Sequence, residues 1–251
     1  MTRCFYDLMV FIHVLSSQNA FRQIRKLGFS GVGAAVSAKN LIEQPSEILK
    51  RLNELRDSGK LEDVDVVTRL AIDTHVETGF LKRLLQKWRR RVEIISVHAL
   101  SRELTALACR DTRIDIVTLV PGARVFKGDI WYMKEYGKRL ELLLNPLQEA
   151  DIVSRSKALA YYSTIINLVD KKSELQQSLI FSSGAMNICQ LRDPRALVSL
   201  LKFLGLSTNA SLDTVSTNVL KLVSECRDKL SGIVPVRGVR IISREDMPGS
   251  V

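Results

Sequence analysis

The chain has 251 residues, of which 46% are hydrophobic and 25% are charged. This is an ordinary globular composition, and a chain of this length can bury a large core without disulfide or metal staples. Lysine and arginine total 37 against 27 for aspartate and glutamate, which gives a formal net charge of +10. Such an excess either attracts a polyanion or is only a solvated basic surface, and charge alone does not separate these two interpretations.

The sequence also argues against a metal-stapled, secreted or membrane protein. Its four cysteines, Cys4, Cys109, Cys189 and Cys226, form no C-x-x-C pair and have no histidine cluster beside them, so a zinc site is not expected. The N-terminus opens with polar residues, and no apolar run approaches the length of a membrane span. We therefore expect a cytoplasmic protein with reduced thiols and no membrane contact.

The N-terminal half alternates short apolar runs with helical patterns. Residues 5–11 form the first predicted strand, and a helix over 17–26 follows it and is stopped by Gly28 in a left-handed cap. The pattern continues with a strand at 31–36, a helix at 45–56 with Pro45 in its first turn, a strand at 64–72 and a helix at 78–90.

The C-terminal half keeps the same alternation. Strands are predicted at 92–97, 114–120, 140–144 and 179–181. Helices are predicted up to Arg110 after an N-cap at Ser101, at 130–136, at 154–169, from Pro194 to Leu204 after an N-cap at Asp193, near Leu212, and at 217–230.

Seven strands, each followed by a helix, require parallel pairing with right-handed crossovers. Both an open doubly wound sheet and a closed barrel satisfy that order, and periodicity does not choose between them. No linker of low complexity divides the chain. We therefore expect a single domain over residues 1–251, with 232–251 as an extended C-terminal tail.

The carboxyl ends of parallel strands, where α/β enzymes place their chemistry, offer few catalytic groups here. A metal hydrolase would draw on Asp7, His75, Glu77 and His98, but the chain has only 3 histidines and no H-x-H or H-x-x-x-H pair. The plainer interpretation is a structural carboxylate and polar rim residues. We expect neither a metal ligand nor a catalytic residue in this chain.

Positive charge is most concentrated in residues 81–91, LKRLLQKWRRR, which contain no acid. Helical spacing places the leucines and Trp88 on one face and Arg83, Lys87 and Arg90 on another, with Lys82, Arg89 and Arg91 widening the basic side. Phosphate contact and a merely solvated basic face remain equally good explanations of this pattern alone.

Other cations are predicted at positions that suit polyanion binding. Lys39 follows the second strand, and Arg155 opens the helix after the sixth. Arg192 and Arg195 flank a helix start, where guanidinium groups and helix amides could together meet phosphates. Arg69 lies inside an apolar strand and therefore needs either a phosphate or a carboxylate such as Asp7. Aromatic residues are only 6% and scattered in sequence, so base stacking is not expected.

Several segments, taken in order, resemble the p30-type subunit family of archaeal and eukaryotic ribonuclease P. They are FYDLMV at 5–10, LGFSGVG at 27–33, the stretch 179–206 with SSGA before an RDPR helix start, and SLDTVSTNVLKLV at 211–223. Between residues 40 and 139 the similarity lies in the β-α pattern. The resemblance implies a distorted, mostly parallel TIM-type (β/α) barrel, related to the polymerase-and-histidinol-phosphatase type, with extra C-terminal helices.

The same resemblance implies a role in removing the 5′ leader from precursor tRNA as part of an RNA-based endoribonuclease. The RNA subunit would carry the Mg²⁺-dependent chemistry, and this chain would bind no cofactor itself. Its partners would be the ribonuclease P RNA and a small ferredoxin-like protein subunit in a 2:2 heterotetramer, with indirect or weak contact to precursor tRNA. The expected RNA-binding residues are Lys39, Arg69, Arg83, Lys87, Arg90, Arg155, Arg192 and Arg195.

Two alternatives remain open from the sequence. The first is a stand-alone metal-dependent phosphoesterase of the polymerase-and-histidinol-phosphatase type that uses Asp7, His75 and His98. The second is a basic barrel that binds a small phosphorylated ligand at the turn of residues 182–185.

Overall fold

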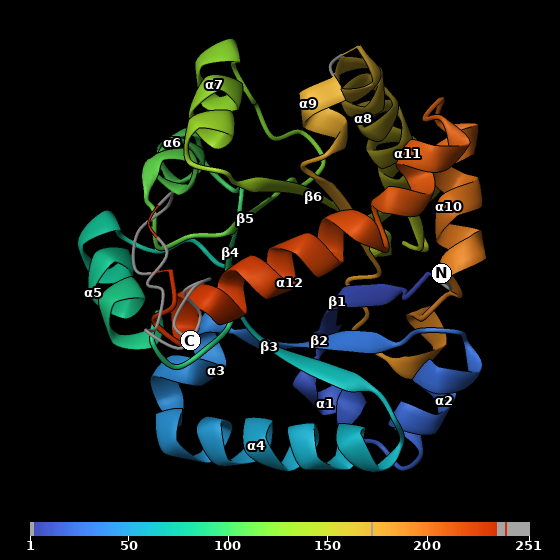
Figure 1. The fold of residues 1–251 in the computed structure, drawn as a ribbon. Helices are drawn as coiled ribbons and strands as arrows, with labels where there is room; N and C mark the ends of the chain where they lie inside the picture. Colours follow the sequence, from blue (N-terminus) through green and yellow to red (C-terminus); the bar gives the residue numbers. More distant parts are fainter. Residues whose placement is uncertain (1–2, 172, 235–238, 240–251) are drawn as a thin grey trace, which may run out of the picture.

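The computed structural model describes residues 3–171, 173–234 and 239. Seven parallel strands form one sheet in sequence order. Figure 1 shows them arranged around a common axis, with helices on the outside. The strands are β1 (Tyr6–Phe11), β2 (Gly31–Ser37), β3 (Asp65–Ile72), β4 (Ile94–His98), β5 (Ile116–Thr118), β6 (Arg139–Leu143) and β7 (Leu179–Ser182).

The sheet curls into a nearly closed barrel, which decides between the two architectures that the sequence allows. At the carboxyl end, the Phe11 amide donates to the Ala185 carbonyl at 3.2 Å and the Ala185 amide donates to the Met9 carbonyl at 3.1 Å. At the other end, Thr214 and Val215 fill the gap between the edge strands. The Phe181 and Tyr6 amides donate to their carbonyl oxygens at 3.3 and 2.9 Å, respectively.

The strand order and most helices match the prediction. The helices are α1 (Ile12–Leu15), α2 (Ala20–Lys26), α3 (Ala38–Glu43), α4 (Pro45–Leu61), α5 (Thr78–Trp88), α6 (Arg102–Arg110), α7 (Lys127–Glu135), α8 (Ile152–Asp170), α9 (Ser173–Gln176), α10 (Pro194–Phe203), α11 (Thr208–Asp213) and α12 (Thr217–Leu230). Short 3-10 turns are η1 (Asn145–Leu147) and η2 (Ile188–Gln190). The short helices α1, α3 and α9 and both turns are absent from the prediction, because one helical turn carries too little periodic signal.

The predicted helix ends are confirmed where a capping residue was identified in the sequence. Ser101 accepts the Leu104 amide at 3.2 Å and Asp193 accepts the Ala196 amide at 3.0 Å, as N-caps do. Gly28 has a φ of +96°, the left-handed cap that the sequence predicts. Gly33 permits close approach of β1 and β2, because a Cβ there would lie 2.1 Å from the Leu8 carbonyl oxygen.

Helix α12 crosses the amino end of the barrel and covers it (Figure 1). Its apolar residues Val219, Leu222, Val223 and Cys226 pack with barrel-interior residues Tyr6, Leu8, Val67, Ile94, Ile116 and Ile180. The larger core lies between the strands and the outer helices. The C-terminal helix therefore belongs to the barrel core and is not an appendage.

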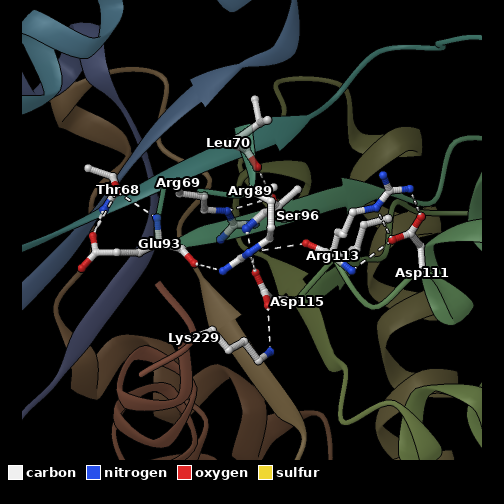
Figure 2. A network of polar contacts seen from close by, with 12 residues as sticks. Thr68, Arg69, Leu70, Arg89, Glu93, Ser96, Asp111, Arg113, Asp115 and Lys229 are labelled. Atoms are coloured by element: carbon white, nitrogen blue, oxygen red, sulfur yellow. Dashed lines mark hydrogen bonds and ion pairs between the residues drawn. The ribbon is translucent and has the colours of Figure 1, made fainter. Parts of the chain in front are cut away.

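Ion pairs hold α12 against the amino ends of the strands. Arg227 of α12 donates to Glu93 and to Asp65, each at 2.8 Å. Lys229 donates to Asp115 at 3.2 Å, and Figure 2 shows that Arg89, the residue after α5, contacts the same carboxylate. These ion pairs fix α12 against β3, β4 and β5. Most of the predicted tail, residues 232–251, lies outside the described residues, and none of the described helices is both long and apolar enough for a membrane crossing.

Candidate functional site

Asp7, the second residue of β1, and His98, the last residue of β4, are buried titratable groups. Asp7 accepts the Met9 amide at 3.2 Å and the Ser183 amide at 3.0 Å through Oδ1, and its Oδ2 has no partner among the described residues. Burial raises the pKa of Asp7 to about 6, against hydrogen bonds from Ser183 and Met9 that lower it. Burial, followed by the charge of Arg69, lowers the pKa of His98 to about 4, so its imidazole is neutral at pH 7.

These groups do not assemble a metal centre. Within residues 3–171, 173–234 and 239, no three His, Cys, Asp or Glu side chains are placed to hold an ion together. His75 and Glu77 lie in the exposed loop before α5, and Asp7 lies fully buried on β1. The donor set that a stand-alone metallohydrolase needs is therefore not brought together by these residues.

The turn at residues 182–185 is also unsuited to binding phosphate. Its Ser182 and Ser183 side chains are fully buried. The Ser183 amide is bonded to Asp7, and the Ala185 amide is bonded to Met9. Because the Ser183 and Ala185 amides already have partners within the barrel, these two residues serve closure of the sheet.

Arg69 is a correction to the predicted RNA contacts. Its side chain is fully buried and forms a bidentate ion pair with Glu141, at 2.7 Å from Nη1 to Oε1 and 2.5 Å from Nη2 to Oε2. It also donates to Ser96, to Thr118 and to the Leu8 carbonyl. The alternative of a carboxylate partner is right, but that partner is Glu141 of β6 and not Asp7. A guanidinium with all these bonds inside the barrel cannot reach RNA.

The basic helix α5 follows its predicted pattern over Thr78–Trp88, but it ends two residues before the predicted Arg90, which lies in the turn that follows. Leu81, Leu84, Leu85 and Trp88 are buried, and Arg83, Lys87 and Arg90 are exposed. None of these three cations has an ion pair with an acid in the described part of the chain. Arg89 differs from the prediction because it turns inward to Asp115 at 2.5 Å (Figure 2). Arg91 lies over the Trp88 ring at 5.6 Å.

The other predicted cations are exposed at or near the carboxyl rim. Lys39 lies on α3 and Arg155 on the first turn of α8, and neither has an ion pair with a described acid. Arg195 likewise opens α10, and Arg192 donates to the Cys189 carbonyl at 2.6 Å.

Side-chain N-caps already accept the first amides at the starts of α10 and α8. Asp193 already accepts the first amides of α10, from Arg195 and Ala196. Asp151 does the same for Val153 and Ser154 in α8. These N-caps occupy the donors that a phosphate would use, so any phosphate contact there depends on side chains.

Cations on α2 and α4 pair with acids, and this contrast makes the unpaired cations distinctive. Arg22 of α2 pairs with Glu62 at 2.9 Å, and Arg25 pairs with Asp63 at 2.7 Å. On α4, Lys60 pairs with Asp57 at 3.4 Å. The excess charge of the chain is therefore not spread evenly: cations are matched by acids around α2 and α4, and are unmatched on α5 and at the start of α8 and α10.

Trp131, Tyr132 and Tyr136 lie close together on α7 and at its C-cap, a cluster that the sequence analysis did not predict. The Tyr132 ring lies under the Arg110 guanidinium at 4.3 Å and stacks with Tyr136 at 6.2 Å. Trp131 meets Tyr132 edge-on at 4.9 Å. The four-residue spacing of the two tyrosines was the available signal, because such residues share one helix face.

Comparison with known proteins gives a consistent result over nearly the whole chain. The family model described as RNase P subunit p30 matches residues 4–230. Ribonuclease P protein component 3 of Methanosarcina barkeri is 24% identical over 230 residues, which cover 89% of this chain and 90% of that protein. Its counterpart from Methanothermobacter thermautotrophicus is 20% identical over 232 residues, with 90% of each chain covered.

Solved structures share the fold. A chain in the cryo-EM structure of archaeal ribonuclease P with mature tRNA has a TM-score of 0.72 and 18% identity, and the match covers 97% of this chain and 99% of that one. An N-acetyl-D-glucosamine-6-phosphate deacetylase from Mycobacterium smegmatis has a TM-score of 0.52 and 9% identity, with 88% and 77% covered. The barrel architecture is thus common to proteins with quite different chemistry.

Proposed function

Since the chain belongs to the RNase P subunit p30 family, it is a protein subunit of ribonuclease P, and we propose that it binds the catalytic RNA of that enzyme through its unmatched surface cations. The holoenzyme is an endoribonuclease that removes the 5′ leader from precursor tRNA. The contribution of this chain is affinity and support for folded RNA, and bond breaking occurs elsewhere.

The observation that carries this proposal is the uneven pairing of charge. Arg83 and Lys87 of α5, and Arg90 in the turn just after it, are exposed without carboxylate partners among the described residues, and the opposite face of α5 is fixed in the core. Each cation that neutralises a phosphate releases a condensed counterion, which favours binding at low salt. Lys39, Arg155, Arg192 and Arg195 add exposed cations toward the carboxyl rim.

The chemistry is assigned to the RNA subunit, which uses Mg²⁺. This assignment is supported by the burial of Asp7 and His98 and by the absence, among the described residues, of three ligand-type side chains placed to hold an ion. In this proposal the chain binds RNA through its surface cations and does not itself hydrolyse a phosphoester.

The assembly that we propose also contains a small ferredoxin-like protein subunit, in a 2:2 heterotetramer with this chain. Contact with precursor tRNA is indirect or weak. The cytoplasm is the proposed location, and the free thiols Cys4, Cys109, Cys189 and Cys226 agree with a reducing compartment.

Reconstitution tests the proposal directly. The catalytic RNA is assembled with the small protein subunit, with and without this chain, and precursor tRNA cleavage is measured over a range of Mg²⁺ concentrations. We expect the chain to raise the cleavage rate and to lower the Mg²⁺ requirement. An unchanged rate, together with phosphoester hydrolysis by the purified chain without RNA, would favour the metallohydrolase instead.

A further inference from the structure

A groove lies between the segment that follows β5 and one side of α8. Its volume is about 600 Å³, within the size range of small-ligand sites. Ala123, Val125 and Phe126 line one side, and Tyr161, Ile165 and Leu168 of α8 line the other. The Tyr161 hydroxyl donates to the Ala123 carbonyl at 2.9 Å and so ties the two sides together.

Phe126 is held in a fixed position at this groove. Its residue is 51% exposed, and the Arg102 guanidinium lies over its ring at 4.6 Å. The buried Asp129 carboxylate accepts Arg102 at 2.6 and 3.0 Å and the Phe126 amide at 2.9 Å. Because Arg102 covers one face of the ring, a flat apolar group can stack on the other face.

The remaining lining groups carry positive charge or hydrogen-bonding capacity. Arg124 and Lys171 are exposed and have no ion pair with a described acid. The Asn167 side-chain amide is exposed and has no hydrogen-bond partner among the described residues. An amide can both donate and accept, which suits the edge of a nucleobase. No acid occurs among the lining residues that the structure describes.

We propose that this groove binds an unpaired nucleotide of RNA, with the base stacked on Phe126, its edge read by Asn167, and its phosphates near Arg124 and Lys171. Proteins read single-stranded RNA in this way, by stacking extruded bases on aromatic rings beside cations. The charge of the rim favours a nucleotide over an apolar protein segment. The inference rests on the proposed function and deepens it, because it adds recognition of an unpaired base to contact with the backbone.

The test compares two labelled RNAs, a hairpin with an unpaired loop and a blunt duplex of equal length, bound to the full chain and measured by fluorescence anisotropy. We expect Phe126→Leu to weaken hairpin binding by about 5-fold to 100-fold, the range for loss of one base stack, and to leave duplex binding unchanged. Phe126→Tyr should restore hairpin binding, because it keeps the aromatic face. Phe203→Leu is the matched control, since Phe203 is an aromatic residue that is 76% exposed on α10, outside this groove.

A second variant keeps the inference testable if Phe126→Leu disturbs the fold. Asn167→Asp places a negative charge in the groove at an exposed helical position and should weaken hairpin binding similarly. Wild-type affinity of both Phe126→Leu and Asn167→Asp for the hairpin would overturn the inference while leaving the proposed function intact. Loss of affinity for the small protein subunit, with hairpin binding unchanged, would overturn it in favour of protein docking. Failure of the wild-type chain to bind either RNA would remove the proposed function and this inference together.

Discussion

Arg69 and Glu141 form a fully buried, bidentate ion pair in the middle of the barrel, linking β3 to β6 across its interior. The Glu141 carboxylate also accepts Thr118 at 2.7 Å and Ser182 at 2.8 Å. Burial raises the pKa of Glu141, but the Arg69 charge and these hydrogen bonds outweigh it, so the pKa lies below its usual range. The barrel interior is thus crossed by a satisfied polar network.

We expect Arg69→Met to lower the free energy of unfolding by about 3–5 kcal/mol, because the Glu141 carboxylate would stay buried without its counter-charge. Urea denaturation followed by circular dichroism measures this change. The double variant Arg69→Met, Glu141→Leu should recover part of the loss, since apolar residues can replace a buried pair.

The same variant separates a structural role from RNA contact. Folded Arg69→Met should bind RNA with the wild-type salt dependence. A decrease of about 0.7–0.9 in the slope of log K against log salt concentration corresponds to the loss of one phosphate contact. Such a decrease would mean that Arg69 contacts RNA.

Local patterns in the sequence predicted most of the helices and strands. Ser101 and Asp193 cap helices because a side-chain oxygen satisfies amides only two or three residues away, which a short sequence window contains. The buried stripe of α5, from Leu81 to Trp88, follows from helical spacing. Assignment of residues 1–251 to a single domain stays a prediction.

Long-range partners could not be derived in the same way. Glu141 lies 72 positions from Arg69, and several acids were equally eligible from spacing. The apolar face of α12 is visible in sequence, but nothing local shows that it covers the barrel end. Likewise, exposure of Phe126 beside α8 depends on packing between segments about 40 residues apart. Such contacts are set by tertiary geometry, which periodicity does not encode.

Removing the unmatched cations of α5 should weaken RNA binding mainly through its salt dependence. We expect the triple variant Arg83→Ala, Lys87→Ala, Arg90→Ala to reduce the salt slope by about 2 to 3, because each of the three lost phosphate contacts is worth about 0.7–0.9. Affinity is measured from about 50 to 200 mM salt, the range over which such contacts are strongly screened. Alanine favours helix, so the fold should be retained.

The matched control for α5 changes three paired cations, Arg22→Ala, Arg25→Ala and Lys60→Ala, and therefore removes the same formal charge. This variant should keep a slope close to that of the wild type. Equal effects of the two triple variants would show that net charge, and not the position of α5, governs binding.

Asp7 should make stability fall as pH rises through the mildly acidic range. Its pKa is raised by burial from 3.8 to about 6, and the charge of Glu141 adds to this. Between these two values the folded state binds more protons than the unfolded state, so the free energy of unfolding decreases with increasing pH. The contribution of this group is fully present below about pH 4 and lost above about pH 6.

Asp7→Asn isolates that contribution, because the amide keeps an oxygen for the Met9 and Ser183 amides but does not titrate. We expect the stability of the variant relative to wild type to rise by up to about 3 kcal/mol between pH 4 and pH 7. Urea denaturation at each pH measures it. A difference that is constant over this range would show that the pKa of Asp7 is the same in the folded and unfolded states.

Substitutions in α12 test whether this helix closes the amino end of the barrel. Leu222 is 1% exposed and packs with the barrel-interior cluster, whereas Leu220, two positions earlier on the same helix, is 37% exposed. We expect Leu222→Ala to lower the free energy of unfolding by about 2–5 kcal/mol, because it leaves a cavity where the helix covers the strands. Leu220→Ala removes the same atoms from a partly solvated site and should cost well under half as much. Thermal and urea unfolding of both variants measure the contrast, and similar losses at the two positions would mean that α12 does not seal the amino end of the barrel.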